Sequence, residues 1–255
     1  MGWLFGRNAR DRKRPAYARL APETAVAEAS APRQSTPAAA ARPTPAQALD
    51  ALKAGNAAFL RGENNLGHVK ANDLDELQAG QAPIATIVGC ADSRTPPTIL
   101  FNQGFGRLFS IRVAGNTVDR RGLASIVYAV KHLNCPLVVV MGHTGCGAVA
   151  AAEAIVDGRA DMDPSLEAMI EPIIPAVLSA RRSRPANPAA AAVEENARTV
   201  ARKLATADIA LEQALAEGSL IIVGAVKDMS SGRVRFLETF AGASTPTTAR
   251  VPEPA

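Results

Sequence analysis

Two short motifs carry side chains suited to metal binding and acid–base chemistry. The first, CADSR, occupies residues 90–94, and the second, HTGC, occupies residues 143–146. Together they offer two thiols, one imidazole, one carboxylate and one guanidinium. Two thiolates and one imidazole form a common three-ligand set for zinc, and such a set leaves the fourth coordination position to water or substrate. The sequence therefore indicates a catalytic metal centre.

Each motif directly follows a run of apolar residues. Residues 85–88 read ATIV before the first motif, and residues 137–142 read LVVVMG before the second. Apolar runs of this length are typical of strands that are buried on both faces of a parallel sheet. Because ligands bind at the carboxyl edge of open α/β sheets, we expect the two motifs to meet at that edge.

The combined pattern resembles the β-carbonic anhydrase family. Cys-x-Asp-x-Arg is followed about fifty residues later by His-x-x-Cys, and the flanking segments GCADSRTPP, LFSIRVAGN and VVMGHTGCGAV also resemble that family. The resemblance extends from about Ala46 to Glu238. Within the family, the active-site pattern is similar to that of the plant-like branch.

The resemblance implies a carbonic anhydrase with one zinc per chain, which reversibly hydrates carbon dioxide to bicarbonate and a proton. It assigns Cys90, His143 and Cys146 as zinc ligands, and Asp92 and Arg94 as the catalytic pair. Zinc lowers the pKa of a bound water to about 7, so that hydroxide is available to attack carbon dioxide. Asp92 would accept a hydrogen bond from this hydroxide, and Arg94 would hold the carboxylate off the metal. Without that restraint, Asp92 becomes a candidate fourth ligand.

The resemblance also implies a substrate pocket. It assigns a substrate hydrogen bond to Gln81 and the wall of the carbon dioxide pocket to Phe109 and Tyr128, although both aromatic residues would also fit a hydrophobic core. The N–H of Gly147, at an expected helix N-terminus, is a further candidate for binding an anion. In the family, Gln81 and the aromatic wall reach the zinc across a dimer interface, so we expect a homodimer or a tetramer.

Strands that alternate with helices predict an α/β fold, with a mainly parallel central sheet, one antiparallel edge strand and helices on both faces. The expected strands are residues 84–91, 107–114, 137–142, 220–226 and 233–238. The expected helices are residues 46–62, 73–79, 98–103, 122–133, 147–156, 165–180, 194–205 and 208–217, with a loop at 181–188.

Composition divides the chain into a disordered basic Ala/Pro-rich arm (1–45), a catalytic domain (46–240) and a flexible tail (241–255). The net charge of +4 arises in the arm, because residues 1–20 carry six basic residues and one acidic residue. The remainder of the chain carries 22 basic and 23 acidic residues. This near-neutral remainder argues against nucleic-acid binding. No run of 18 apolar residues predicts a transmembrane segment, and three cysteines fit a reducing, cytoplasmic location.

Two alternative functions remain open from the sequence. A zinc hydrolase of carbon disulfide or carbonyl sulfide would share the fold and the metal but differ in access to the pocket. A non-catalytic zinc-binding module would be favoured by loss of Asp92 or Arg94, and both residues are present.

Overall fold

Five strands form one sheet in the computed structural model, which describes residues 42–63, 77–78 and 80–242. The strand order is β2-β1-β3-β4-β5; β4 and β5 pair antiparallel, and the other neighbours pair parallel. The strands are β1 (Ala85–Gly89), β2 (Leu108–Arg112), β3 (Leu137–His143), β4 (Ile221–Lys227) and β5 (Val234–Phe240). The predicted mainly parallel sheet with one antiparallel edge strand is confirmed.

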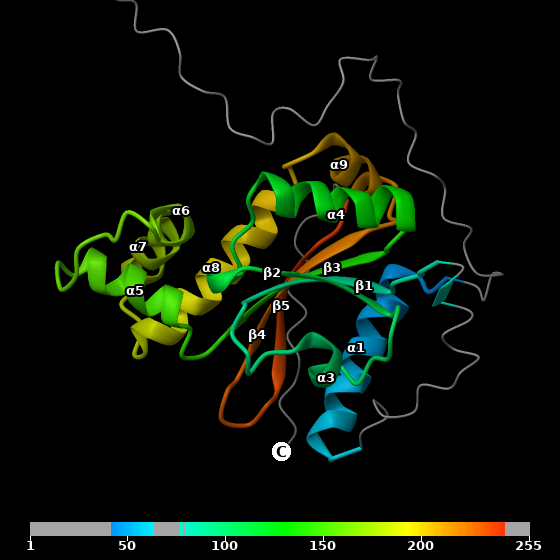
Figure 1. Ribbon diagram of the computed structural model, residues 1–255, viewed down its shortest axis with the longest axis horizontal. Helices are drawn as coiled ribbons and strands as arrows, with labels where there is room; N and C mark the ends of the chain where they lie inside the picture. Colours follow the sequence, from blue (N-terminus) through cyan, green and yellow to red (C-terminus); the bar gives the residue numbers. More distant parts are fainter. Residues whose placement is uncertain (1–41, 64–76, 79, 243–255) are drawn as a thin grey trace, which may run out of the picture. The chain divides into compact units, whose positions relative to one another are not determined.

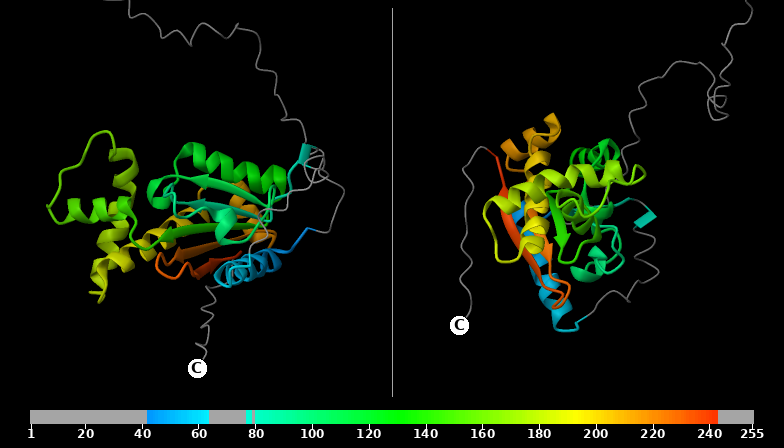
Figure 2. Two further views of the ribbon diagram at one scale, coloured as in Figure 1. Left: turned by 60° about the horizontal axis from the view of Figure 1, so that its bottom comes forward. Right: turned by 90° about the vertical axis from the view of Figure 1, so that its left-hand side faces the viewer.

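Helices cover both faces of this sheet, as predicted. In Figure 1, α1 and α3 lie on one side of the strands, and α4, α8 and α9 lie on the other. The helices are α1 (Pro45–Leu60), α3 (Pro97–Leu100), η2 (Ala114–Asn116), α4 (Arg120–Leu133), α5 (Gly147–Val156), α6 (Glu167–Ile170), η3 (Glu171–Ile173), α7 (Ile174–Arg182), α8 (Pro188–Leu204) and α9 (Ile209–Ala216). The two further views in Figure 2 show α5, α6 and α7 grouped beside one end of the sheet.

The central strand β3 is buried along its whole length. Its side chains alternate between the two faces, so that Val139 and Met141 pack in the cluster with α1, whereas Val138 and Val140 pack in the cluster with α4, α8 and α9. This double burial explains why β3 reads as a continuous apolar run rather than as an alternating one. It also gives the second motif a rigid support.

A buried amide fastens α1 to the rest of the domain. Asn56 donates hydrogen bonds from Nδ2 to the carbonyls of Leu100 (3.1 Å) and Gly232 (3.2 Å). Its Oδ1 accepts from the N–H of Val234 (2.9 Å). Both ends of this amide are thus satisfied, as burial of a polar group requires.

The prediction of one helix over residues 165–180 is wrong. The chain forms α6, then the 3-10 turn η3, and then α7, which ends at Arg182. Pro172 and Pro175 lie in this stretch. Proline cannot donate a helical hydrogen bond and its ring clashes with the preceding turn, so a continuous helix is interrupted there.

The prediction that a helix begins at Glu194 is also wrong, because α8 begins at Pro188 inside the stretch expected to be a loop. Asn187 is the N-cap, and its side chain accepts a hydrogen bond from the N–H of Ala190. An Asn N-cap followed by Pro at the first helical position is a strong start signal. This Asn-Pro pair accounts for the start of α8 six residues before the predicted one.

Three predictions concern residues that are mostly outside the described part of the chain. They are the arm (1–45, of which 42–45 are described), the helix at 73–79 (77–78) and the tail at 241–255 (241–242). Among the helices that the structure does describe, none combines the length and the apolar character needed to cross a bilayer.

Candidate active site

The two motifs meet at the carboxyl edge of the sheet, where β1 and β3 are adjacent and parallel. Cys90 directly follows β1, and His143 is the last residue of β3. Cys146 is the N-cap of α5, and Gly147 is the first residue of that helix. The turn between His143 and Cys146 requires the positive φ of Gly145 (68°), which glycine adopts without strain.

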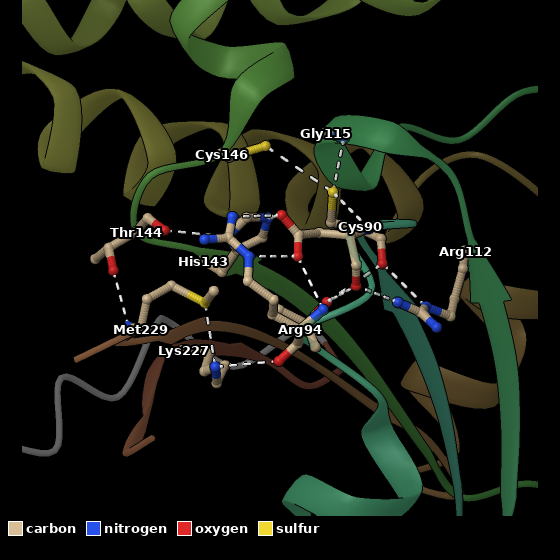
Figure 3. Close-up of polar contacts among 11 residues, drawn as sticks. Cys90, Arg94, Arg112, Gly115, His143, Thr144, Cys146, Lys227 and Met229 are labelled. Atoms are coloured by element: carbon tan, nitrogen blue, oxygen red, sulfur yellow. Dashed lines mark hydrogen bonds and ion pairs between the residues drawn. The ribbon is translucent and has the colours of Figure 1, made fainter. Parts of the chain in front are cut away.

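The side chains of Cys90, His143 and Cys146 form a buried cluster in which the three ligand atoms all lie within 4.8 Å of one another (Figure 3). The two sulfurs are 4.0 Å apart, close to the separation of about 3.8 Å expected for two thiolates on one tetrahedral zinc. Nδ1 of His143 lies 3.1 Å from the Thr144 carbonyl, so that Nδ1 is the protonated nitrogen. Nε2 is buried without a hydrogen-bond partner among the described residues. The donor set therefore fits zinc.

Hydrogen bonds converge on the sulfur of Cys90. The side chain of Cys146 and the N–H groups of Asp92 (3.4 Å) and Gly115 (3.3 Å) all contact it, and they lower the pKa of the Cys90 thiol. The pKa of Cys146 is raised by its hydrogen bond with Cys90 and by burial. Burial lowers the pKa of His143, but the nearby sulfur of Cys90, the Thr144 carbonyl and the Asp92 carboxylate together give a net increase. These contacts favour the thiolate form of Cys90, the form that binds metals.

Asp92 and Arg94 form a bidentate ion pair beside the cluster. Nε and Nη2 of Arg94 donate to Oδ1 and Oδ2 of Asp92 at 2.9 and 2.7 Å, and the Arg94 main-chain N–H donates to Oδ1 at 2.9 Å. These hydrogen bonds hold the pKa of the Asp92 carboxyl well below its usual range. The carboxylate Oδ2 is 3.8 Å from Nε2 of His143. An ionised acceptor is therefore fixed next to the candidate metal position.

Two cationic side chains hold the backbone of the first motif from either side (Figure 3). Arg112, at the end of β2, donates to the carbonyls of Cys90 (3.0 Å) and Asp92 (2.5 Å). Lys227, at the end of β4, donates from Nζ to the carbonyl of Arg94 (3.2 Å). Lys227 is buried, and burial lowers its pKa. The sequence analysis did not predict that Arg112 and Lys227 hold the first motif. The signal for both was their position as the last residue of a strand at the carboxyl edge of the sheet.

The predicted pocket residues lie elsewhere in the domain. Phe109 and Tyr128 pack with their ring centroids 6.3 Å apart, in a cluster with Cys135, which precedes β3. Gln81 precedes β1, whereas Cys90 follows it. These three predicted residues therefore lie toward the amino ends of the strands, and the metal cluster lies at the carboxyl ends. One chain does not bring the two groups together.

The sequence matches the carbonic anhydrase family profile over residues 85–234. It is 39% identical over 189 residues to carbonic anhydrase 2 of Mycobacterium tuberculosis, a match covering 74% of this chain and 91% of that relative. The chain belongs to the β-carbonic anhydrase family. It is also 36% identical over 192 residues to a carbonic anhydrase of Mycolicibacterium smegmatis, covering 75% of this chain and 93% of the relative.

Solved β-carbonic anhydrase structures share this fold. A tetrameric enzyme from Sordaria macrospora aligns with a TM-score of 0.58 at 26% identity, over 64% of this chain and 85% of the other. The Coccomyxa enzyme in complex with acetazolamide aligns with a TM-score of 0.54 at 26% identity, over 76% and 83%. The protein is thus a carbonate dehydratase, which reversibly hydrates carbon dioxide to bicarbonate and a proton. The two alternative functions are not favoured.

Proposed function

We propose that one zinc ion per chain is held by Cys90, His143 and Cys146. The observation that supports this most strongly is the imidazole of His143, whose buried Nε2 has no hydrogen-bond partner in the described residues and lies in a cluster with two sulfurs. When bound, zinc would lower the pKa of a water to about 7 and so provide an oxygen nucleophile at neutral pH. The remaining steps depend on side chains of this chain.

Asp92 orients the nucleophile in this mechanism. Its ionised carboxylate accepts a hydrogen bond from the attacking oxygen, which directs a lone pair toward the carbon of carbon dioxide. Arg94 keeps the carboxylate ionised and restrained through two parallel hydrogen bonds. If that restraint is lost, Asp92 becomes free to approach the metal as a fourth ligand, which would close the site.

Gly147 is proposed to bind the anionic product. Gly147 is the first residue of the ten-residue helix α5 and directly follows the proposed ligand Cys146. Main-chain N–H groups at a helix N-terminus lack intrahelical acceptors and carry partial positive charge, so they favour anions. Bicarbonate leaving the metal centre would meet this end of α5.

The substrate pocket is proposed to form between two subunits. Gln81, Phe109 and Tyr128 lie at the opposite end of the strands from Cys90, so they can reach a metal centre only in another copy of the chain. The partner subunit's Gln81 would then hydrogen-bond the substrate, and the partner subunit's Phe109 and Tyr128 would form the apolar wall. A homodimer is the smallest assembly that completes such a site, and a tetramer contains two such dimers.

A cytoplasmic location is also proposed. It is supported by the three cysteines, none of which forms a disulfide in the structure. Disulfides are rare in reducing compartments such as the cytosol. Fractionation of cells that express the full chain would test this, with the enzyme expected in the soluble cytoplasmic fraction.

Stopped-flow hydration of carbon dioxide, combined with metal analysis of the same purified preparation, tests the proposed zinc chemistry. We expect one zinc per chain and hydration that is lost when a chelator removes the zinc and restored when zinc is added back. Full hydration activity in a preparation that contains no metal would overturn the proposal.

A further inference from the structure

A chain of hydrogen bonds connects α8 to the sulfur of Cys90. Asn196, on α8, is 1% exposed, and its Nδ2 donates to the carbonyl of Gly115 at 2.8 Å. Gly115 in turn donates its N–H to the Cys90 sulfur at 3.3 Å. Asn196 thus acts on the residue that contacts Cys90, although it does not contact the sulfur itself.

Gly115 needs an external restraint to hold this position. Its φ is 73°, and a Cβ there would lie 2.5 Å from Cδ1 of Ile173 and 3.1 Å from the Cβ of Ala148. The site therefore requires glycine, the residue with the greatest backbone freedom. Because glycine has little intrinsic preference for one conformation, the hydrogen bond from Asn196 supplies orientation that the residue itself lacks.

Only one end of the buried Asn196 amide has a hydrogen-bond partner among the described residues. Oδ1 of Asn196 and Nδ2 of Asn116 are both buried without a hydrogen-bond partner among the residues that the structure describes. An unsatisfied buried polar atom costs about 1–3 kcal/mol, so the free Oδ1 offsets part of the stability that the Nδ2 hydrogen bond contributes. Asn56, the other buried amide described above, uses both of its ends.

We propose that Asn196 is a positioning residue for the metal centre. It fixes Gly115 so that the N–H points at the Cys90 sulfur, which sets the position of that ligand. The inference rests on the proposed zinc site. Side chains that orient metal ligands through such contacts typically contribute 10–100-fold to metal affinity.

The test compares Asn196→Leu with the matched control Asn56→Leu in the full-length protein. Both changes remove a buried amide that donates to main-chain carbonyls. Only the Asn196 amide is linked to the Cys90 sulfur, through the hydrogen bonds of Gly115. Two quantities are measured, namely the zinc dissociation constant by chelator competition and the sulfur-to-cobalt charge-transfer band after cobalt substitution. We expect Asn196→Leu to weaken zinc binding roughly 10- to 100-fold and to shift the band, while Asn56→Leu lowers only the melting temperature.

The outcomes separate this inference from the zinc proposal. Wild-type protein that binds no stoichiometric zinc would refute the zinc site itself. Zinc-binding wild type, together with unchanged affinity and an unchanged band in Asn196→Leu, would refute only the role of Asn196, as would equal weakening in Asn56→Leu. Asn196→Ala, measured in parallel, removes the same donor without adding bulk. If neither Asn196 variant folds while Asn56→Leu does, Asn196 serves the fold and the proposal is wrong.

Discussion

The candidate metal ligands (Cys90, His143 and Cys146) and the aromatic cluster (Phe109 and Tyr128 with Cys135) lie toward opposite ends of the sheet's strands. They are held in place by different kinds of contact. At the carboxyl ends, Cys90 and Asp92 are held by directed hydrogen bonds from the main chain and from Arg94 and Arg112. Toward the amino ends, Phe109 is held by ring packing. One chain therefore completes the proposed ligand set but does not enclose it with its own aromatic residues.

This difference predicts two distinguishable kinds of defect. Directed hydrogen bonds fix the position and charge of a group, so changes at the carboxyl ends should alter metal content or turnover. Ring packing shapes an apolar surface, as in the tilted contacts of Phe109 with Tyr128 and of Tyr128 with His132 (5.4 Å between the centroids of the latter pair). Changes there should impair the use of substrate while the metal stays bound.

The largest effect is expected from the proposed ligands. Cys90→Ser and Cys146→Ser each replace a thiolate with a hydroxyl that is a poor zinc ligand at neutral pH, so stoichiometric zinc and hydration should both be lost. Metal analysis and stopped-flow rates check this. The third cysteine provides the control. Cys135 lies in the aromatic cluster, away from the proposed ligands, so Cys135→Ala should retain zinc. Full zinc content in both serine variants would show that the ligand assignment is wrong.

Changes to the ion pair should have the next largest effect. Arg94→Ala frees the Asp92 carboxylate to ligate the metal, and Asp92→Asn removes the anionic acceptor. In each variant the hydration rate at neutral pH should fall roughly a hundred- to ten-thousand-fold with zinc still bound, the range for losing a positioned acid–base group. Rates measured against pH, with zinc content determined in each preparation, provide the check. Near-wild-type rates in both zinc-replete variants would contradict the proposed mechanism.

A smaller loss is expected in the aromatic cluster. Phe109→Ala combined with Tyr128→Ala removes the proposed apolar wall, so kcat/KM should fall roughly ten-fold or more, the scale of an apolar pocket contact. Zinc content should remain at one per chain. The variant is informative only as a zinc-loaded dimer, which size-exclusion chromatography verifies. Unchanged kcat/KM in that dimer would mean that both rings serve only the core.

The smallest effect is expected from removing residues 1–40. The arm lacks a core-forming pattern, and the deletion keeps Arg42, which donates to the Leu133 carbonyl, and Thr44, which caps α1. Specific activity should stay within about two-fold of wild type, as expected for a segment that buries little apolar surface. Activity and oligomeric state of the truncated chain test this, and a change in either would assign the arm a role in the catalytic domain.

The sequence predicted what depends on local pattern. Apolar runs identified β1 and β3, and the motifs that follow them brought Cys90, His143 and Cys146 together as expected. The errors near Pro172 and Asn187 were also local, since a proline interruption and an Asn-Pro helix start were both readable.

Other residues were beyond the reach of local pattern. Arg112, Lys227 and Asn196 act on the motif or on its neighbour Gly115 from distant parts of the chain. Their roles depend on strand register and on how α8 packs over the sheet. Neither is encoded in the spacing of neighbouring residues, so only the three-dimensional structure reveals them.

A mixed dimer most directly tests whether each site draws on two subunits. One chain carries Cys90→Ser, and the other, with a different affinity tag, carries Phe109→Ala and Tyr128→Ala. If the aromatic wall acts across the interface, the heterodimer contains one intact site and should have about half the wild-type hydration rate, since a symmetric dimer has two equivalent sites. A rate no higher than half that of the Phe109/Tyr128 double-variant homodimer would show that each chain supplies its own wall and would contradict the two-subunit site.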